Sequence, residues 1–170
     1  VFKIRTLDDG KKVKEWAENC ESALVTGAGL IGIEIAYAFK KMGLKVTLCE
    51  MLPQIVPRSL DPDMAKIITD YLISEGIDVV LGQPITELKG EDGRVKTAVF
   101  EDGTEADADM VILATGVRAE LTLPKMAGCD CGRWAVLVND RMATSVPDVY
   151  AVGDCVESYS AILRSNTVSQ

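Results

Sequence analysis

The sequence lacks histidine entirely, and only 5% of its 170 residues are aromatic. Without histidine, a zinc site would need four thiolate or carboxylate ligands, and the five cysteines include no Cys-x-x-Cys pair. We therefore predict no metal site. No apolar run approaches about 20 residues and no secretory signal pattern is present, so we expect no membrane span.

Positive charge is also scarce, since 18 Lys and Arg residues face 26 Asp and Glu residues and give a net charge of −8. This balance argues against nucleic acid or an anionic membrane as a partner, because phosphate-rich surfaces need a basic patch. A single pyrophosphate can still be held by backbone N–H groups at a helix N-terminus. The odd cysteine count favours mostly reduced thiols and a cytoplasmic location.

Strand and helix patterns alternate along the first part of the chain. Thr6 and Asp9 form a capping-box pattern that predicts a helix through Glu18. Continuous apolar runs predict buried strands, and helical spacing predicts helices between them. The expected strands are 22–26, 45–49, 77–81 and 110–114, and the expected helices are 30–42 and 61–75.

The pattern changes between residues 85 and 107, where short alternating stretches are broken by Asp92-Gly93 and Asp102-Gly103. Asp-Gly between alternating runs is typical of hairpins. We therefore predict an α/β fold, a Rossmann-like parallel sheet with an antiparallel three-stranded meander at about 85–107. Two further strands are expected at 135–138 and 149–152, followed by a polar, frayed tail from Ser158.

The run Gly27-Ala28-Gly29-Leu30-Ile31-Gly32 follows the first expected strand and opens the next helix. In this context Gly27 allows a tight turn, Gly29 lets the backbone approach a pyrophosphate, and Gly32 lets the helix pack closely on the strand. The helix N-terminus then presents free N–H groups and a partial positive charge to the phosphates. The run predicts a dinucleotide site; the alternative is a merely structural strand–helix turn.

Glu50 ends the second expected strand, 21 positions after Gly29. A carboxylate there can accept hydrogen bonds from the adenosine ribose hydroxyls and repels a 2′-phosphate. The next residue is Met51 and not an arginine, so NAD is favoured over NADP, although Arg58 lies on the same loop. Glu34 lies on the first turn of the following helix, where a carboxylate commonly only stabilises the helix dipole.

Three motifs together resemble the FAD-dependent pyridine nucleotide–disulfide oxidoreductases. The run 26–34 resembles the NAD-binding domain of that family, 111–118 its Ala-Thr-Gly strand end, and 144–154 its second flavin motif, in matching order and spacing. The runs 5–9 and 152–155 are most similar to the branch of NADH oxidase, NADH peroxidase and coenzyme A-disulfide reductase.

The resemblance implies NAD(H) as cofactor, with FAD in the parent enzyme. It places Leu30 and Ile31 beside the pyrophosphate, Gly116 near the nicotinamide half and Glu34 beside the nicotinamide ribose or amide. It places Asp154 at a helix start, against the flavin ribityl chain or phosphate. The candidate cofactor-binding residues are Gly27, Gly29, Leu30, Ile31, Gly32, Glu34, Glu50, Gly116 and Asp154; no residue is predicted to be catalytic.

Departures from the family pattern also matter. The family's first flavin motif, the redox cysteine next to it and the C-terminal interface domain are not in this sequence, which begins with Val1. Ala119 replaces the usual proline, and Ser59 stands where some relatives carry an aromatic residue. We therefore expect a piece of a longer enzyme: a connecting segment and helix at 1–20, an NAD(H)-binding domain at 21–117, and at 118–170 a return segment and truncated part of the FAD-binding domain.

The main functional hypothesis is the NAD(H)-binding domain of a flavin-dependent NADH oxidase or disulfide reductase, inactive in isolation. It positions NADH for hydride transfer to FAD, and its partners are NADH and the flavin domain of the same parent chain, possibly in a homodimeric parent. Two alternatives stay open. One is the equivalent domain of a ferredoxin or nitrite reductase-type flavoprotein, and the other is a free-standing NAD-binding module without catalysis.

Overall fold

The computed structural model describes residues 1–160, 162 and 164–168. The chain forms two compact units, Val1–Gly116 and Val117–Gln170. In the described part, no helix is both long enough and apolar enough to cross a membrane.

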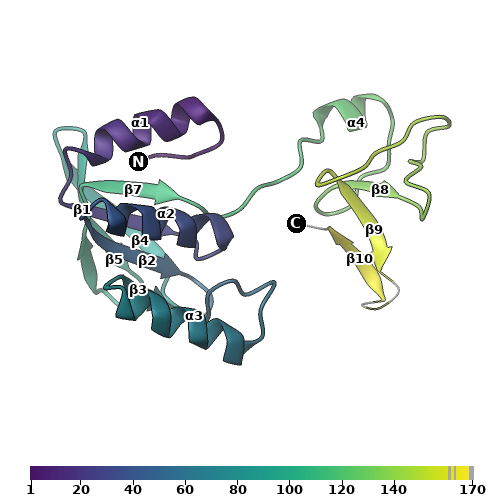
Figure 1. Ribbon diagram of the computed structural model, residues 1–170. Coiled ribbons are helices and arrows are strands. Elements are labelled where there is room, and N and C mark those ends of the chain that lie inside the picture. The colour runs from purple at the N-terminus through teal and green to yellow at the C-terminus, as the bar shows by residue number, and fades with distance from the viewer. Residues whose placement is uncertain (161, 163, 169–170) are drawn as a thin grey trace. The chain divides into compact units, whose positions relative to one another are not determined.

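The first unit is built on a four-stranded parallel sheet in the order β3-β2-β1-β7 (Figure 1). The chain passes from β1 through a helix to β2 and through a second helix to β3, and it reaches β7 on the other side of β1 only after the meander. The elements are α1 (Leu7–Ala17), β1 (Ser22–Thr26), α2 (Leu30–Lys41), β2 (Lys45–Glu50), α3 (Pro62–Ser74), β3 (Asp78–Leu81) and β7 (Met110–Leu113).

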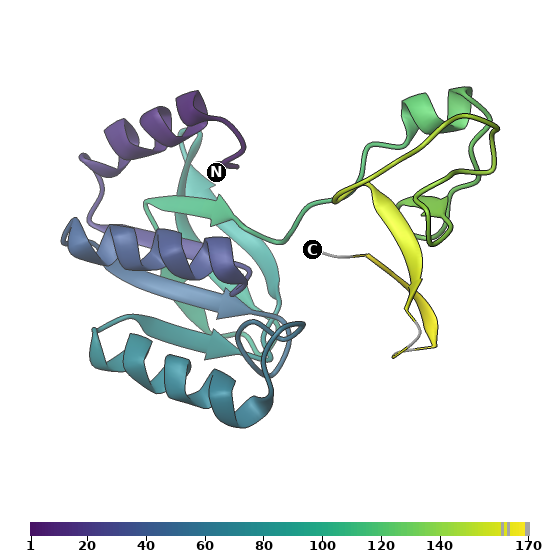
Figure 2. The same cartoon turned by 45° about the vertical axis from the view of Figure 1, so that its right-hand side comes forward.

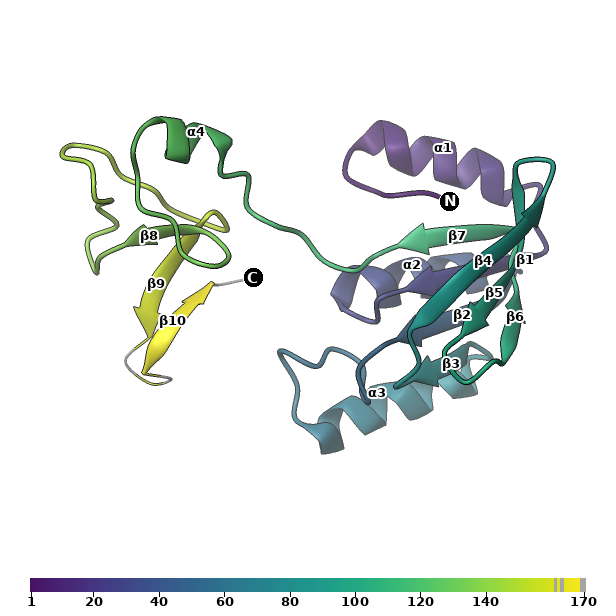
Figure 3. The same cartoon turned by 180° about the vertical axis from the view of Figure 1, so that it is seen from behind.

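Both faces of the parallel sheet are covered, and this explains its continuous apolar runs. In β1, Ala23 and Val25 join the core cluster under the helices, whereas Leu24 joins the cluster under the meander. All three side chains are fully buried. Figures 2 and 3 show α2 and α3 on one face and the meander on the other.

The meander consists of β4 (Ile85–Glu91), β5 (Arg94–Phe100) and β6 (Glu105–Asp107), paired antiparallel in that order. Asp92 and Gly93 join β4 to β5 with φ of 50° and 74°, the backbone that a tight primed turn requires. The predicted Rossmann-like sheet with a three-stranded meander is therefore confirmed.

Two local contacts fix the ends of elements in this unit. The predicted capping box is present, since the Thr6 hydroxyl accepts from the Asp9 N–H and the Asp9 carboxylate accepts from the Thr6 N–H. At the amino ends of β1 and β7, the Asp109 carboxylate accepts hydrogen bonds from the backbone N–H groups of Glu21 and Ser22 and from the Ser22 hydroxyl. Partial burial opposes ionisation, but these hydrogen bonds prevail and lower the pKa of Asp109.

The second unit contains α4 (Thr122–Met126) and a small sheet in the order β10-β9-β8. β8 (Val136–Val138) pairs parallel with β9 (Val156–Ser160), which pairs antiparallel with β10 (Ser165–Val168). The predicted strand at 135–138 is therefore present.

Two predictions for this unit are wrong. The expected strand at 149–152 does not form, since only Tyr150 makes an isolated bridge, to Ala143. The tail expected to fray from Ser158 forms most of a hairpin instead, because β9 and β10 satisfy each other's backbone groups. Residues 161, 163, 169 and 170 of that tail lie outside the described residues.

Candidate functional site

The glycine loop follows the carboxyl end of β1, at the point where the strand order of the sheet reverses. β2 lies on one side of β1 and β7 on the other, and α/β proteins bind ligands in the crevice at such a switch point. The loop and the end of β7 are in contact, because a Cβ added to Gly27 would overlap the carbonyl oxygen of Ala114.

Two of the three glycines stand where the backbone geometry favours glycine. Gly27 has a φ of +98°, which makes the turn. A Cβ added to Gly32 would overlap the carbonyl oxygen of Gly27, so only glycine lets α2 approach β1 this closely. The Cβ position of Gly29 instead has no atom within 4 Å, so the space beside its Cα is open. This is the side from which a pyrophosphate can approach.

Two large apolar side chains flank that open space at the start of α2. Leu30 is 68% exposed and Ile31 is 56% exposed. The N-cap of the helix is Gly29, which has no side chain to cap the first N–H groups. The helix therefore begins with uncapped N–H donors beside an exposed apolar surface. The donors suit an anionic group, and the apolar surface suits a ring system attached to it.

Glu50 is held against the glycine loop by two backbone hydrogen bonds. One carboxylate oxygen accepts the N–H of Ala28 at 2.9 Å, and the other accepts the N–H of Leu52 at 3.0 Å. Each oxygen can accept a second hydrogen bond, so the carboxylate retains capacity for ribose hydroxyls. The side chain is thus fixed beside the glycine loop.

The loop after β2 also anchors the glycine loop, and sequence reasoning missed this contact. The N–H of Val56 donates to the carbonyl of Ala28 at 2.8 Å, and both side chains are buried. Val56 has a φ of +43°, an uncommon conformation for a β-branched residue. No local sequence signal marks Val56, because valine favours extended backbone.

The remaining predicted residues are distributed over both units. Gly116, with a φ of +98°, is the last residue of the first unit and follows the end of β7. Glu34 is exposed and lies just beyond the first turn of α2, not on it as predicted. Asp154 belongs to the second unit and is exposed in a turn before β9. The helix predicted to start at Asp154 is therefore a strand.

The cysteine next to Glu50 is a core residue. Burial raises the pKa of the Cys49 thiol to about 11, so it stays protonated at neutral pH and is a poor nucleophile. Within the described part of the chain, no group of three potential ligands could hold a metal ion.

Comparison with known proteins gives one family match over almost the whole chain. The model of the family described as pyridine nucleotide-disulphide oxidoreductase matches residues 1–169. The NADH oxidase of Methanocaldococcus jannaschii is 48% identical over 171 residues, which cover 99% of this chain and 38% of that protein. The rubredoxin-NAD(+) reductase of Ectopseudomonas oleovorans is 34% identical, over 91% of this chain and 40% of that protein.

A solved structure shows the same fold. The ferredoxin reductase of Rhodopseudomonas palustris superposes with a TM-score of 0.93 and 28% identity, over 100% of this chain and 42% of the other. The chain thus spans about two fifths of the length of these three proteins.

Proposed function

The chain belongs to the pyridine nucleotide–disulphide oxidoreductase family, and on this premise we propose that it is the NAD(H)-binding part of a flavin-dependent NADH oxidoreductase. Proteins of this family use NAD(H) and FAD. In the proposal, the first unit binds NADH at the glycine loop and presents its nicotinamide to a flavin held elsewhere in the parent protein. The cofactors supply the hydride chemistry, and the protein supplies position and electrostatics.

The observation that carries the proposal is the preformed loop around Gly29. The space beside the Gly29 Cα is open, while hydrogen bonds with Glu50 and Val56 hold the N–H and the carbonyl of the neighbouring Ala28. A preformed loop with uncapped helix N–H donors can bind a pyrophosphate with little loss of conformational entropy.

We propose NAD rather than NADP as the preferred dinucleotide, because the Glu50 carboxylate cannot turn away without losing two hydrogen bonds. A 2′-phosphate beside it would meet an uncompensated negative charge. In the same proposal, Leu30 and Ile31 border the pyrophosphate, and Glu34 and Gly116 lie toward the nicotinamide half.

The second unit supports the flavin half of the proposal. Within its described residues, large apolar side chains stay exposed, as expected for a segment completed by further protein. They include Trp134 (40%), Tyr150 (65%), Val152 (66%) and Tyr159 (65%). Asp154 would contact FAD there, and we assign 118–170 to a flavin domain, 21–117 to the NAD(H) domain and 1–20 to the connection between them.

The terminal electron acceptor distinguishes two versions of the proposed function. Similarity to an NADH oxidase at 48% identity favours an oxidase or disulfide reductase, whereas similarity to a rubredoxin reductase at 34% keeps an electron-transfer flavoprotein open. A homodimeric parent and a cytoplasmic location belong to the same proposal. The free-standing module without catalysis is the alternative in which no flavin domain accompanies the chain.

Calorimetric titration of the chain with NADH and with NADPH tests the proposal. We expect NADH to bind at least about tenfold more tightly, the size of one charge-assisted interaction. Equal affinities for NADH and NADPH, or tighter binding of NADPH, would contradict the proposed role of Glu50. The absence of binding for both nucleotides would contradict the proposed function itself.

A further inference from the structure

The loop between β2 and α3 holds Val56 in the left-handed region of backbone conformation, with a φ of +43°. Among the described residues, it is the one β-branched side chain at a positive φ. Left-handed backbone brings the Cβ close to the following carbonyl oxygen, so it is unfavourable for residues other than glycine and most of all for a branched one. Surrounding interactions must therefore hold Val56 in this conformation.

Packing and hydrogen bonds within the loop supply those interactions. The Val56 side chain is 5% exposed and packs in the core cluster under the helices, as does the fully buried Ile55. The Val56 carbonyl accepts the N–H groups of Ser59 at 3.0 Å and of Leu60 at 3.2 Å. The Leu60 carbonyl accepts in turn from the side-chain amide of Gln54 at 2.8 Å. The loop is thus a closed structure built around a buried valine.

The N–H of Val56 connects this loop to the proposed pyrophosphate site. It donates to the carbonyl of Ala28 at 2.8 Å, and that carbonyl shares one peptide unit with the N–H of Gly29, the N-cap of α2. A peptide unit is planar and trans, so its carbonyl and its N–H point in opposite directions. Within the described part of the chain, the Gly29 N–H has no acceptor of its own. Val56 therefore sets the direction of an unused donor.

We propose that Val56 is a positioning residue for the dinucleotide, an inference that rests on the proposed NADH site. Its buried side chain keeps the backbone left-handed, its N–H holds the Ala28 carbonyl, and the shared peptide plane directs the Gly29 N–H at the pyrophosphate. NADH and NADPH have the same pyrophosphate. Val56 therefore sets the affinity for both nucleotides, whereas Glu50 sets the preference between them.

The substitutions Val56→Ala and Val56→Gly test this role by calorimetry. Both remove the buried side chain, but alanine retains the penalty of a positive φ, whereas glycine adopts it readily. We expect Val56→Ala to weaken NADH binding about tenfold and Val56→Gly only about threefold. A residue that only fills space would give the reverse order, because glycine leaves the larger cavity.

NADPH affinity separates this role from that of Glu50. Both Val56 variants should weaken NADPH binding by the same factor as NADH binding, so the preference between the nucleotides stays constant. Unchanged NADH affinity in Val56→Ala, weaker binding in Val56→Gly than in Val56→Ala, or a changed preference would overturn the proposal. Failure of the unaltered chain to bind NADH would instead contradict the proposed function, and this role with it.

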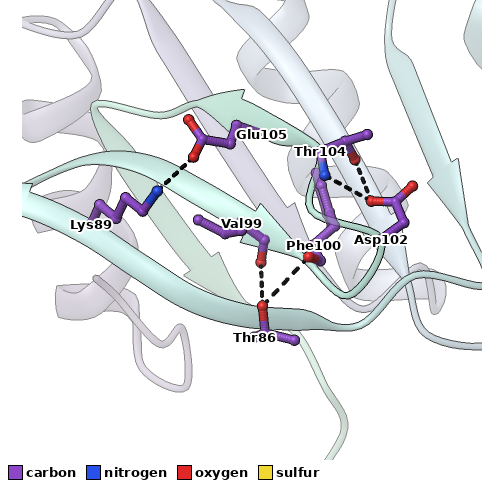
Figure 4. Close-up of polar contacts among 7 residues, drawn as sticks. All are labelled: Thr86, Lys89, Val99, Phe100, Asp102, Thr104 and Glu105. Atoms are coloured by element: carbon purple, nitrogen blue, oxygen red, sulfur yellow. Dashed lines mark hydrogen bonds and ion pairs between the residues drawn. The ribbon is translucent and has the colours of Figure 1, made fainter.

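Asp92 provides a matched control, because it has a φ of +50° in the turn of the meander. The meander is held by contacts within itself: Glu105 lies 2.6 Å from the Lys89 ammonium, and the Thr104 hydroxyl donates to Asp102 at 2.7 Å (Figure 4). Asp92→Ala and Asp92→Gly should differ in thermal stability for the same backbone reason. Both should leave NADH affinity unchanged.

Thermal unfolding of each variant shows whether it folds. If Val56→Ala does not fold, amide hydrogen exchange in the unaltered chain decides the matter. Saturating NADH should slow exchange of the Val56 N–H at least about tenfold more than exchange of the Ala108 N–H, which donates to Lys96 in the meander, because the nucleotide favours the closed loop. Equal slowing at the two amides would overturn the proposal.

Discussion

The carboxylate of Glu50, the last residue of β2, accepts the backbone N–H of Ala28 at 2.9 Å, in the loop that follows β1. Through this bond, the residue predicted to read the ribose also holds the loop predicted to bind the pyrophosphate. The two halves of the proposed adenosine diphosphate site are therefore coupled, and a change in Glu50 should affect both.

Substitution Glu50→Gln tests this coupling. The amide keeps the size of the side chain but removes the charge and one acceptor, so we expect NADH affinity to fall about tenfold and the preference over NADPH to shrink by a similar factor. Calorimetry with both nucleotides measures the two effects. The exposed Glu87→Gln on β4 is the control, and unchanged discrimination in Glu50→Gln would contradict the prediction.

Substitution Gly32→Ala tests the close approach of α2 to β1. The added Cβ overlaps the carbonyl oxygen of Gly27, so we expect a loss of about 2–4 kcal/mol in the free energy of unfolding. Gly10→Ala is the matched control, because nothing lies within 4 Å of its Cβ position inside α1. It should stabilise the chain by about 0.5–1 kcal/mol. Urea unfolding of both variants should give shifts of opposite sign.

Asp109 should contribute a pH-dependent part of the stability. Its pKa is lowered in the folded state, so this contribution is present above the ordinary aspartate pKa and is lost as the pH falls through the folded value. Asp109→Asn should cost about 1 kcal/mol at pH 7, and the difference from the unaltered chain should shrink toward pH 2. Urea unfolding across this range checks it, with Asp70→Asn on α3 as a control that should show no comparable change.

Cys49 should resist alkylation while the chain is folded. Burial raises the pKa of its thiol to about 11, so at pH 8 only about one molecule in a thousand carries the thiolate. We expect iodoacetamide to modify Cys49 only after denaturation, as mapped by mass spectrometry. Rapid labelling of Cys49 in the folded chain would show that the strand end opens.

The chain by itself should neither carry flavin nor oxidise NADH. Asp154, the predicted flavin contact, is exposed in the second unit, and one carboxylate is too few contacts to retain FAD. Absorbance between 350 and 500 nm and an NADH consumption assay test this prediction. A yellow protein, or turnover without added flavoprotein, would contradict it.

Sequence patterns predicted the parallel sheet well because each buried strand is a continuous apolar run bounded by glycine, as at Gly27 and Gly116. They predicted the meander because Asp92-Gly93 specifies a turn almost regardless of context. They failed in the second unit, where the apolar run 149–152 does not pair as a strand. Short apolar runs are ambiguous, since long-range pairing decides whether they form strands.

The sequence alone determined the glycine loop, the spacing of Glu50 and the order of the elements, because backbone freedom and hydrophobic period are local properties of the chain. Tertiary structure alone decided that Glu50 and Val56 hold the N–H and the carbonyl of Ala28, and that Asp109 links the start of β7 to Ser22. These contacts join residues distant in the chain, and only the packing of strands against helices and meander brings them within hydrogen-bonding distance or leaves them apart.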